Sequence, residues 1–230
     1  MPKVSVILTV YNKPEWLVKS IESVLSQTLE DIELIIMEDN SPDPRVGYIL
    51  NDYEGIPNVK IYCSDVSEED RFKTARYATL INKGVREFST GEYITYLADD
   101  DYYYPQRCEV LANALNDHPE WEAVYSTQHV VDVDGNARGM RVFYEPLKKA
   151  WDTIDHNSVM HRRELFFDVG GWPDYPNAWG GADARFFREI NDKGILFYPV
   201  APGVPLEAKR YHTESVQWLI ANGQFFPEGS

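Results

Sequence analysis

Short, almost wholly apolar runs alternate with longer amphipathic segments along the first half of the chain. Residues 4–10 and 32–37 are apolar and rich in β-branched side chains, as expected of parallel strands that are buried on both faces. Between them, apolar residues recur at helical spacing from Pro14, which suits a first helical turn, to about Gln27. This order of strand, helix and strand predicts a right-handed parallel crossover, with ligands at the carboxyl ends of the strands.

The same alternation continues as far as residue 126 and then changes character. Further strands are expected at 59–62, 93–97 and 123–126, with helices over about 74–88 and from about residue 105. The segment 130–143 alternates around Asp134-Gly135, which indicates a hairpin rather than another strand and helix.

The last third of the chain is less regular. It predicts a short helix around 163–169, a loop rich in Gly and Trp over 170–181, a helix over about 182–192 and strands near 195–198 and 206–211. Low-complexity linkers are absent from the sequence. We therefore expect an α/β fold in which residues 1–230 form one domain of two halves, about 1–101 and about 102–230.

Composition and charge narrow the classes of partner. With 230 residues and 43% hydrophobic content, the chain can bury one sizeable core. Its 22 Lys+Arg against 37 Asp+Glu give a formal net charge of −15, which repels a phosphate backbone, so we expect no nucleic acid partner. Such an acidic protein would need a divalent cation, or a few well-placed Arg and Lys side chains, to hold a diphosphate.

The spacing of the cysteines and the length of the first apolar run indicate where in the cell the protein is expected. Cys63 and Cys108 have neither metal-site nor disulfide-framework spacing, and they are expected to be reduced thiols. The run that starts at Val4 is too short for a membrane span and lacks the layout of a signal peptide. A cytoplasmic protein is expected, and peripheral membrane contact through a lipid acceptor stays open.

Three adjacent carboxylates, Asp99, Asp100 and Asp101, follow the strand predicted at 93–97. They repel one another unless water or a cation lies between them. Mn²⁺ or Mg²⁺ prefers carboxylate and phosphate oxygens, which suits an acidic cluster at the end of a strand. A solvated acidic turn before a helix is an equally good interpretation of the triplet alone.

Two further positions could contact a nucleotide. Asp39 ends an earlier strand, and its carboxylate could accept a hydrogen bond from a ribose hydroxyl or a uracil imide; a plain turn with Asn40 and Ser41 is the alternative. Arg71 could contact a diphosphate or stack on a base. Lys73 and Arg76 give a weaker signal of the same kind, and solvated helix charges are the alternative for all three.

A possible base lies in the last third. Asp183 follows Gly180-Gly181 and opens a predicted helix, where N-capping also favours Asp. The preceding loop carries Trp172, Tyr175 and Trp179, aromatic side chains of the kind on which sugars stack, and a carboxylate at its base could deprotonate an acceptor hydroxyl. Lone histidines are more often structural than functional, which is the expectation for the pair at 156 and 161 and, from spacing alone, for the one at 212.

Taken together, these segments resemble the family 2 glycosyltransferases of the GT-A fold. The resemblance extends from residue 2 to about 190 and rests on PKVSVILTVYNKPEWLVKSIESVLSQT, IIMEDNS, KTARYATLIN, GEYITYLADDD, DHNSVMHR and GGADARFF. It implies a mostly parallel central sheet, a Rossmann-like half that binds a nucleotide sugar, and a smaller half that binds the acceptor.

The resemblance also assigns roles to particular residues. It implies that the uridine or thymidine part of a UDP- or dTDP-sugar contacts Thr9, Tyr11, Asp39, Arg71 and, at the ribose, Asp99. It implies Mn²⁺ or Mg²⁺ with Asp100 as the principal ligand and Asp101 and His212 as further ligands. Asp183 would be the general base in an inverting transfer to a carbohydrate or glycolipid acceptor, in surface or extracellular polysaccharide synthesis.

Two other functions stay open from the sequence. A sugar nucleotidyltransferase usually carries a Gly-rich phosphate loop after its first strand, whereas residues 9–13 here are TVYNK and contain no glycine. A non-catalytic nucleotide-sugar-binding module would bind donor and metal without needing Asp183. Kinases and ATPases are disfavoured because the P-loop motif is absent.

Overall fold

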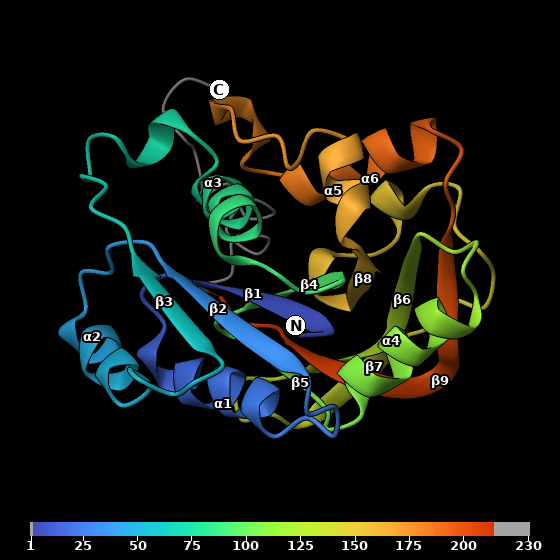
Figure 1. The fold of residues 1–230 in the computed structure, drawn as a ribbon. Coiled ribbons are helices and arrows are strands. Elements are labelled where there is room, and N and C mark those ends of the chain that lie inside the picture. The colour runs from blue at the N-terminus through green and yellow to red at the C-terminus, as the bar shows by residue number, and fades with distance from the viewer. Residues whose placement is uncertain (1, 214–230) are drawn as a thin grey trace.

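One nine-stranded sheet crosses the computed structural model, which describes residues 2–213 (Figure 1). The strand order is β3-β2-β1-β4-β8-β6-β9-β5, and β7 pairs with β6. The strands are β1 (Val4–Val10), β2 (Ile32–Glu38), β3 (Val59–Cys63), β4 (Tyr93–Ala98), β5 (Tyr102–Tyr103), β6 (Ala123–Val131), β7 (Ala137–Arg141), β8 (Val159–Arg162) and β9 (Phe197–Arg210).

The first four strands form the parallel part of the sheet. β1 pairs in parallel with both β2 and β4, and β2 pairs in parallel with β3. Every residue of β2 is buried, including Glu33 and Glu38, as expected of a largely apolar strand covered on both faces. Because these strands run the same way, their carboxyl ends meet at one edge, where Asp39 and the acidic triplet follow β2 and β4.

The rest of the sheet is mixed. β8 is antiparallel to β4 and β6, whereas β9 is parallel to β6 and antiparallel to β5. The two strands predicted at 195–198 and 206–211 are one strand, β9, whose register against β6 shifts on either side of Thr127. That irregularity accommodates the Pro- and Gly-rich stretch 199–205, since a bulge tolerates residues that a regular ladder excludes.

Helices cover both faces of the sheet (Figure 1). One layer contains α1 (Pro14–Leu25), α2 (Pro44–Asn51) and α4 (Arg107–Asp117), and the other contains α3 (Arg76–Lys83), α5 (Arg163–Asp168) and α6 (Ala182–Asp192). Two apolar clusters, one on each side of the sheet, form the core. Among the helices described between residues 2 and 213, none is long and apolar enough to cross a bilayer.

The structure corrects the predicted helix boundaries in two places. The helix expected over 74–88 begins at Arg76 and changes at residue 84 into a wider π turn, Gly84–Phe88. Gly84 packs closely there, since an added Cβ would lie 3.1 Å from the Ile7 side chain. Helix α2 was not predicted, although Asp43 caps it by accepting a hydrogen bond from the backbone N–H of Arg45.

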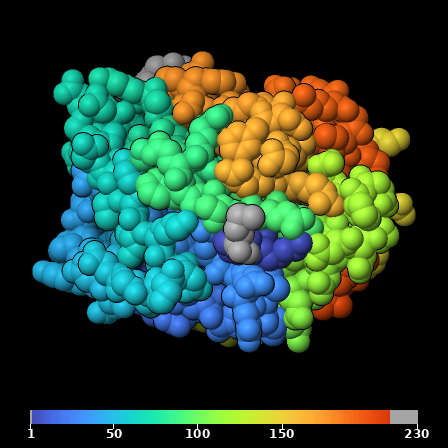
Figure 2. Space-filling model, viewed as in Figure 1, coloured from blue at the N-terminus to red at the C-terminus, as the bar shows by residue number. Residues whose placement is uncertain are grey.

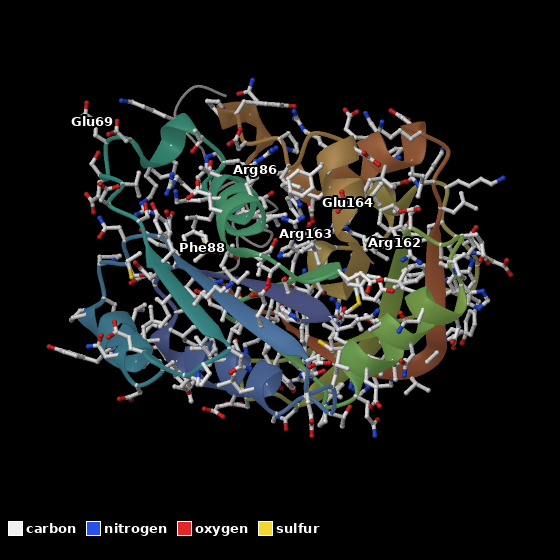
Figure 3. All side chains as sticks on the ribbon, in the orientation of Figure 1. Glu69, Arg86, Phe88, Arg162, Arg163 and Glu164 are labelled. Carbon is white, nitrogen blue, oxygen red and sulfur yellow. The ribbon has the colours of Figure 1, made fainter. Side chains whose placement is uncertain are left out.

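Arginine side chains join the π turn after α3 to α5 through a cation–π contact and hydrogen bonds (Figures 2 and 3). Figure 2 shows the green and orange surfaces of these segments in direct contact. The Arg86 guanidinium, labelled in Figure 3, lies 5.2 Å from the Phe166 ring centre and donates a 2.7 Å hydrogen bond to the Gly170 carbonyl. Arg163, at the start of α5, donates a 3.3 Å hydrogen bond to the hydroxyl of Ser89, the residue after the π turn. These contacts attach the last third of the chain to the first.

Gly91 gives a direct test of the packing that leads into β4. An added Cβ would lie 2.6 Å from the Ser5 backbone nitrogen and 2.7 Å from its hydroxyl, so the backbone would have to move. We expect Gly91→Ala to lower the free energy of unfolding by about 2 to 3 kcal/mol in urea denaturation, as in other overpacked sites. Gly47→Ala in α2 is the control, because a Cβ there meets nothing within 4 Å. Equal stability of Gly91→Ala and wild type would contradict this packing.

A buried ion pair links α4 to β9 beneath the site. Arg107 and Glu207 are both fully buried, and Arg107 Nε donates a 2.7 Å hydrogen bond to Glu207 Oε2. The guanidinium also donates to Thr95 Oγ1 at 3.0 Å and to the carbonyl of Asn157. Arg107 thus holds together three segments that approach the cavity described next.

Candidate active site

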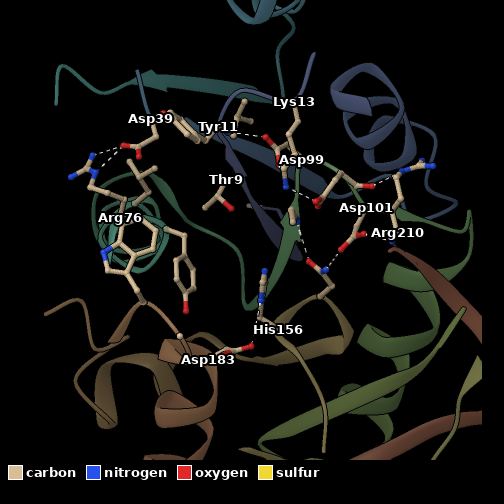
Figure 4. Close-up of a pocket in the computed structure, with 18 of the residues that line it drawn as sticks. Thr9, Tyr11, Lys13, Asp39, Arg76, Asp99, Asp101, His156, Asp183 and Arg210 are labelled. Atoms are coloured by element: carbon tan, nitrogen blue, oxygen red, sulfur yellow. Dashed lines mark hydrogen bonds and ion pairs between the residues drawn. The ribbon is translucent and has the colours of Figure 1, made fainter. Parts of the chain in front are cut away.

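A cavity of about 390 Å³ opens at the carboxyl edge of the parallel strands (Figure 4). Its walls come from the ends of β1, β2 and β4, from the start of α3, from the turn 156–158, from the loop before α6 and from the end of β9. Segments from both halves of the chain therefore meet around one space. Thr9, Tyr11, Asp39, Arg71, Asp99, Asp100, Asp101 and Asp183 all line it.

One wall is built around the carboxylate of Asp39. Arg71 Nη1 donates to Asp39 Oδ2 at 2.6 Å, and Arg76 donates to Oδ1 through Nε at 2.9 Å and Nη2 at 2.5 Å. The Arg71 guanidinium lies 4.1 Å from the ring centre of Tyr11, and its buried Nε has no hydrogen-bond partner among the described residues. The wall therefore offers an aromatic face, a fixed carboxylate and an unused donor.

The opposite wall carries the acidic triplet, and each member has different partners. Asp99 Oδ2 accepts a 2.7 Å hydrogen bond from the Tyr11 backbone N–H. Asp100 Oδ2 contacts Lys13 Nζ and lies 2.8 Å from His212 Nε2. The carboxylate of Asp101 accepts hydrogen bonds from the Arg210 backbone N–H at 2.6 Å and from the side chain of Asn157.

Burial and neighbouring charges decide which of the three acids is ionised. Burial raises the pKa of Asp99 to about 7, although Lys13 opposes the shift. Burial and the charge of Asp100 hold the pKa of Asp101 well above its usual range. Burial acts in the same direction on Asp100, but Lys13 and His212 outweigh it and hold the pKa of Asp100 below its usual range. A further cation would allow more of the triplet to ionise.

The third wall contains Asp183. The N-cap of α6 is Gly181, so Asp183 lies in the first turn and is not the cap residue that its position before the helix suggested. Asp183 Oδ1 accepts a 2.8 Å hydrogen bond from the backbone N–H of Ala184. Its Oδ2 lies 3.8 Å from Nδ1 of His156, a residue that also lines the cavity.

Comparison with known proteins identifies the family of the chain. A family model described as Glycosyl transferase family 2 matches residues 5–168, which include the ends of β1, β2 and β4. The chain belongs to glycosyl transferase family 2. This match confirms the resemblance to family 2 noted in the sequence.

A curated relative shows how far the likeness extends along the chain. Protein CgeD of Bacillus subtilis strain 168 is 40% identical over 209 residues, which are 87% of this chain and 48% of CgeD. The chain thus spans about half the length of that relative.

Solved structures show the fold. S. aureus TarS in complex with UDP-GlcNAc matches with a TM-score of 0.68 at 15% identity, over 94% of this chain and 60% of that one. Mannosyltransferase PcManGT from Pyrobaculum calidifontis, in complex with GDP-Man and Mn²⁺, matches with a TM-score of 0.64 at 17% identity, over 97% and 60%. These likenesses confirm the predicted α/β GT-A fold.

The aromatic loop before α6 contributes fewer residues to the cavity than predicted. Trp179 lines the cavity together with Gly180 and Gly181. Trp172 is instead buried, because its Nε1 donates a 3.1 Å hydrogen bond to the hydroxyl of Tyr96 inside the core. Tyr175 is half exposed, and its hydroxyl accepts a hydrogen bond from Arg185 on the outer surface.

Several residues of the cavity were not singled out from the sequence. Lys13 follows β1 and therefore lies at the same sheet edge as the acids. Its position after a parallel strand could have identified it, as it did Asp39. His156, which was expected to be structural, faces Asp183. Asn157 and Lys209 also line the cavity, but their positions depend on pairing across the second half of the sheet.

Proposed function

We propose that this family 2 glycosyltransferase moves a sugar from a UDP- or dTDP-sugar to the hydroxyl of a carbohydrate or glycolipid, with inversion at the anomeric carbon. The observation that carries the proposal is the arrangement of three carboxylate sites, Asp39, the acidic triplet and Asp183, on separate walls of one cavity. TarS supports a nucleotide-sugar donor, since that protein is described in complex with UDP-GlcNAc. The resemblance further suggests a role in surface or extracellular polysaccharide synthesis.

The nucleoside would occupy the wall built around Asp39. Its base would stack near Tyr11 and Arg71, and Asp39, held by two guanidinium groups, would accept from the imide N–H of uracil or thymine. Asp99 would contact the ribose, and Thr9 would form the floor at the end of β1. Charged partners on both oxygens of Asp39 fix its orientation before the donor arrives.

A divalent cation would be held at Asp100. Asp100 and His212 supply a carboxylate and an imidazole that already share a 2.8 Å contact, and the ammonium of Lys13, which lies against the same carboxylate, would have to move aside for the cation. Among residues 2–213, however, no three acidic, imidazole or thiol groups converge into a metal cluster. Phosphate oxygens of the donor would supply the other ligands, and Asp101 becomes available only if it leaves its present partners. Bound Mn²⁺ or Mg²⁺ would stabilise negative charge on the departing diphosphate.

Asp183 would act as the general base. Its carboxylate would accept the proton of the acceptor hydroxyl while that oxygen attacks the anomeric carbon and the bond to the diphosphate breaks. A single displacement of this kind inverts the configuration. Trp179, Gly180 and Gly181 line the approach to Asp183, so the acceptor can come close while water is kept from the donor.

A donor panel tests the function itself. Release of nucleoside diphosphate would be measured from UDP- and dTDP-sugars with a mixture of oligosaccharide and glycolipid acceptors, in Mn²⁺ and in Mg²⁺. We expect release from one donor that depends on acceptor. Nucleotide binding without release in any combination would favour a binding module, and absence of nucleotide binding would overturn the proposal.

Removal of the metal is expected to stop that release. EDTA should abolish it, and Asp100→Ala should raise the half-saturating Mn²⁺ concentration by more than about 100-fold, because even indirect partners of a metal contribute 10- to 100-fold. The matched control is Asp70→Ala, an exposed acid paired only with its neighbours Lys73 and Ser67. Full release in EDTA would show that this enzyme needs no metal.

A further inference from the structure

His156 and Asp183 come from different elements and lie next to each other in the cavity lining. His156 begins the short 3-10 turn His156–Ser158, and Asp183 lies in the first turn of α6. The distance from His156 Nδ1 to Asp183 Oδ2 is 3.8 Å, and the two side chains are 17% and 18% exposed (Figure 4). The pair therefore lies in the wall of the site rather than in the core.

The backbone on both sides of His156 is held in place. Asp155 Oδ1 accepts a 3.2 Å hydrogen bond from the Asn157 backbone N–H, which caps the turn. Asp155 is itself held by Lys209 Nζ at 2.6 Å and Arg141 Nη1 at 3.1 Å. On the other side, Asn157 Oδ1 accepts from the Ala98 backbone N–H at 3.0 Å. The turn is thus tied to the ends of β4 and β9.

Aromatic rings fix the imidazole itself. The His156 ring is stacked on Tyr77 at 6.3 Å between centres and meets Trp172 edge-on at 5.8 Å. Tyr77 also fixes the start of α6, because its hydroxyl accepts a 2.9 Å hydrogen bond from the Ala182 backbone N–H. One tyrosine therefore positions both members of the pair.

The carboxylate of Asp183 presents its other oxygen to this ring. Oδ1 is occupied by the N–H of Ala184, whereas Oδ2 makes no hydrogen bond within 3.5 Å to any described residue. A carboxylate oxygen has two lone pairs, so a hydrogen bond to Oδ2 would leave one lone pair for an incoming proton.

We propose that His156 is a positioning residue for Asp183: its Nδ1–H donates to Asp183 Oδ2 and turns the carboxylate toward the acceptor hydroxyl. The inference rests on the proposed function, in which Asp183 is the base. The pair needs to close by about 1 Å to form this bond, and catalytic hydrogen bonds often tighten in this way when substrate binds. In the transfer step the acceptor O–H bond breaks, an O–H bond forms on Asp183, and His156 keeps its own proton.

The contact itself can be tested without donor or acceptor. NMR would follow the Nδ1 resonance of the His156 imidazole at fixed pH in wild type and in Asp183→Asn. We expect this resonance to shift in Asp183→Asn, because the variant replaces a carboxylate oxygen that lies 3.8 Å from Nδ1 with a neutral amide. Asp155, Tyr77 and Lys209 also lie around this turn, and they are the same in both proteins. Asp192→Asn, at the far end of α6, is the control and should leave the Nδ1 resonance unchanged. An unchanged Nδ1 resonance in Asp183→Asn would overturn the proposal.

Kinetic measurements on two variants then show whether His156 orients Asp183 or only supports the local fold. His156→Ala should lower kcat by about 10- to 100-fold with little change in the KM for the donor, a loss of the size seen for partners that orient a reacting group. His156→Asn, whose Nδ2–H can donate from nearly the same point, should recover most of kcat. Equal losses in both variants would overturn the positioning role. Failure of the proposed function would give a different result. Wild type would show no turnover, while Asp183→Asn would still change the NMR signal of His156.

Discussion

Replacing Asp183 with asparagine is expected to lower the rate of sugar transfer by at least about a thousandfold, the upper part of the range for general-base catalysis. The amide has the same shape and can still accept the N–H of Ala184 through its oxygen. It cannot take a proton from the acceptor, so the loss falls on the chemical step. The Asp39 wall and the acidic triplet are untouched, and donor binding should persist.

The measurement is single-turnover transfer, with donor affinity determined separately by calorimetry in Mn²⁺. Asp192→Asn makes the same chemical change at the exposed end of α6 and should transfer at the wild-type rate. A rate for Asp183→Asn within tenfold of wild type would remove Asp183 from the role of base. Loss of donor affinity in the same variant would instead assign Asp183 to binding the donor.

Replacing Arg107 with methionine is expected to lower the free energy of unfolding by about 3 to 5 kcal/mol, because it leaves Glu207 buried without its partner. Glu207 is fully buried, and its remaining partners are the neutral side chains of Ser126 and Gln128. Burial already raises the pKa of Glu207, with Arg107 opposing the shift. The lone carboxylate would have to take a proton or admit water.

Urea denaturation checks this, with Arg45→Met as the matched control. Arg45 pairs with Asp43 and Glu15 at the surface, where solvent screens the charges, so its loss should change stability little. The double variant Arg107→Met with Glu207→Gln should recover part of the loss, since the buried charge is then gone. Similar stability of Arg107→Met and wild type would show that the pair contributes nothing to the fold.

The parallel half of the fold could be predicted because its signals are local. Each of β1, β2 and β4 is a largely apolar run, and residues that line the cavity lie at or just after its end. Residues at the same sheet edge could therefore be assigned together, and Asp39 and Asp100 do face one cavity.

The second half could not be predicted in the same way, because its pairing is not local. The prolines and Gly203 within β9 favour a break, whereas the register shift against β6 lets one strand pass through them. Trp172 resembled a sugar-stacking residue, and its burial depends on a hydrogen bond to Tyr96, which is far away in the sequence. His156 had no periodic pattern around it, so only the folded turn could bring it to Asp183.

Residues at and just after the end of β9 contact the acidic triplet far earlier in the sequence, and this has a consequence for synthesis of the protein. His212 contacts Asp100 across 112 positions of sequence, and Arg210 contacts Asp101 across 109. Because a domain generally folds as one unit, we expect the site to be complete only after β9 has left the ribosome. Under the proposed mechanism, a partly synthesised chain would bind nucleotide weakly and lack the residues that complete the diphosphate side. Unfinished chains would then be unable to waste activated sugar by hydrolysis.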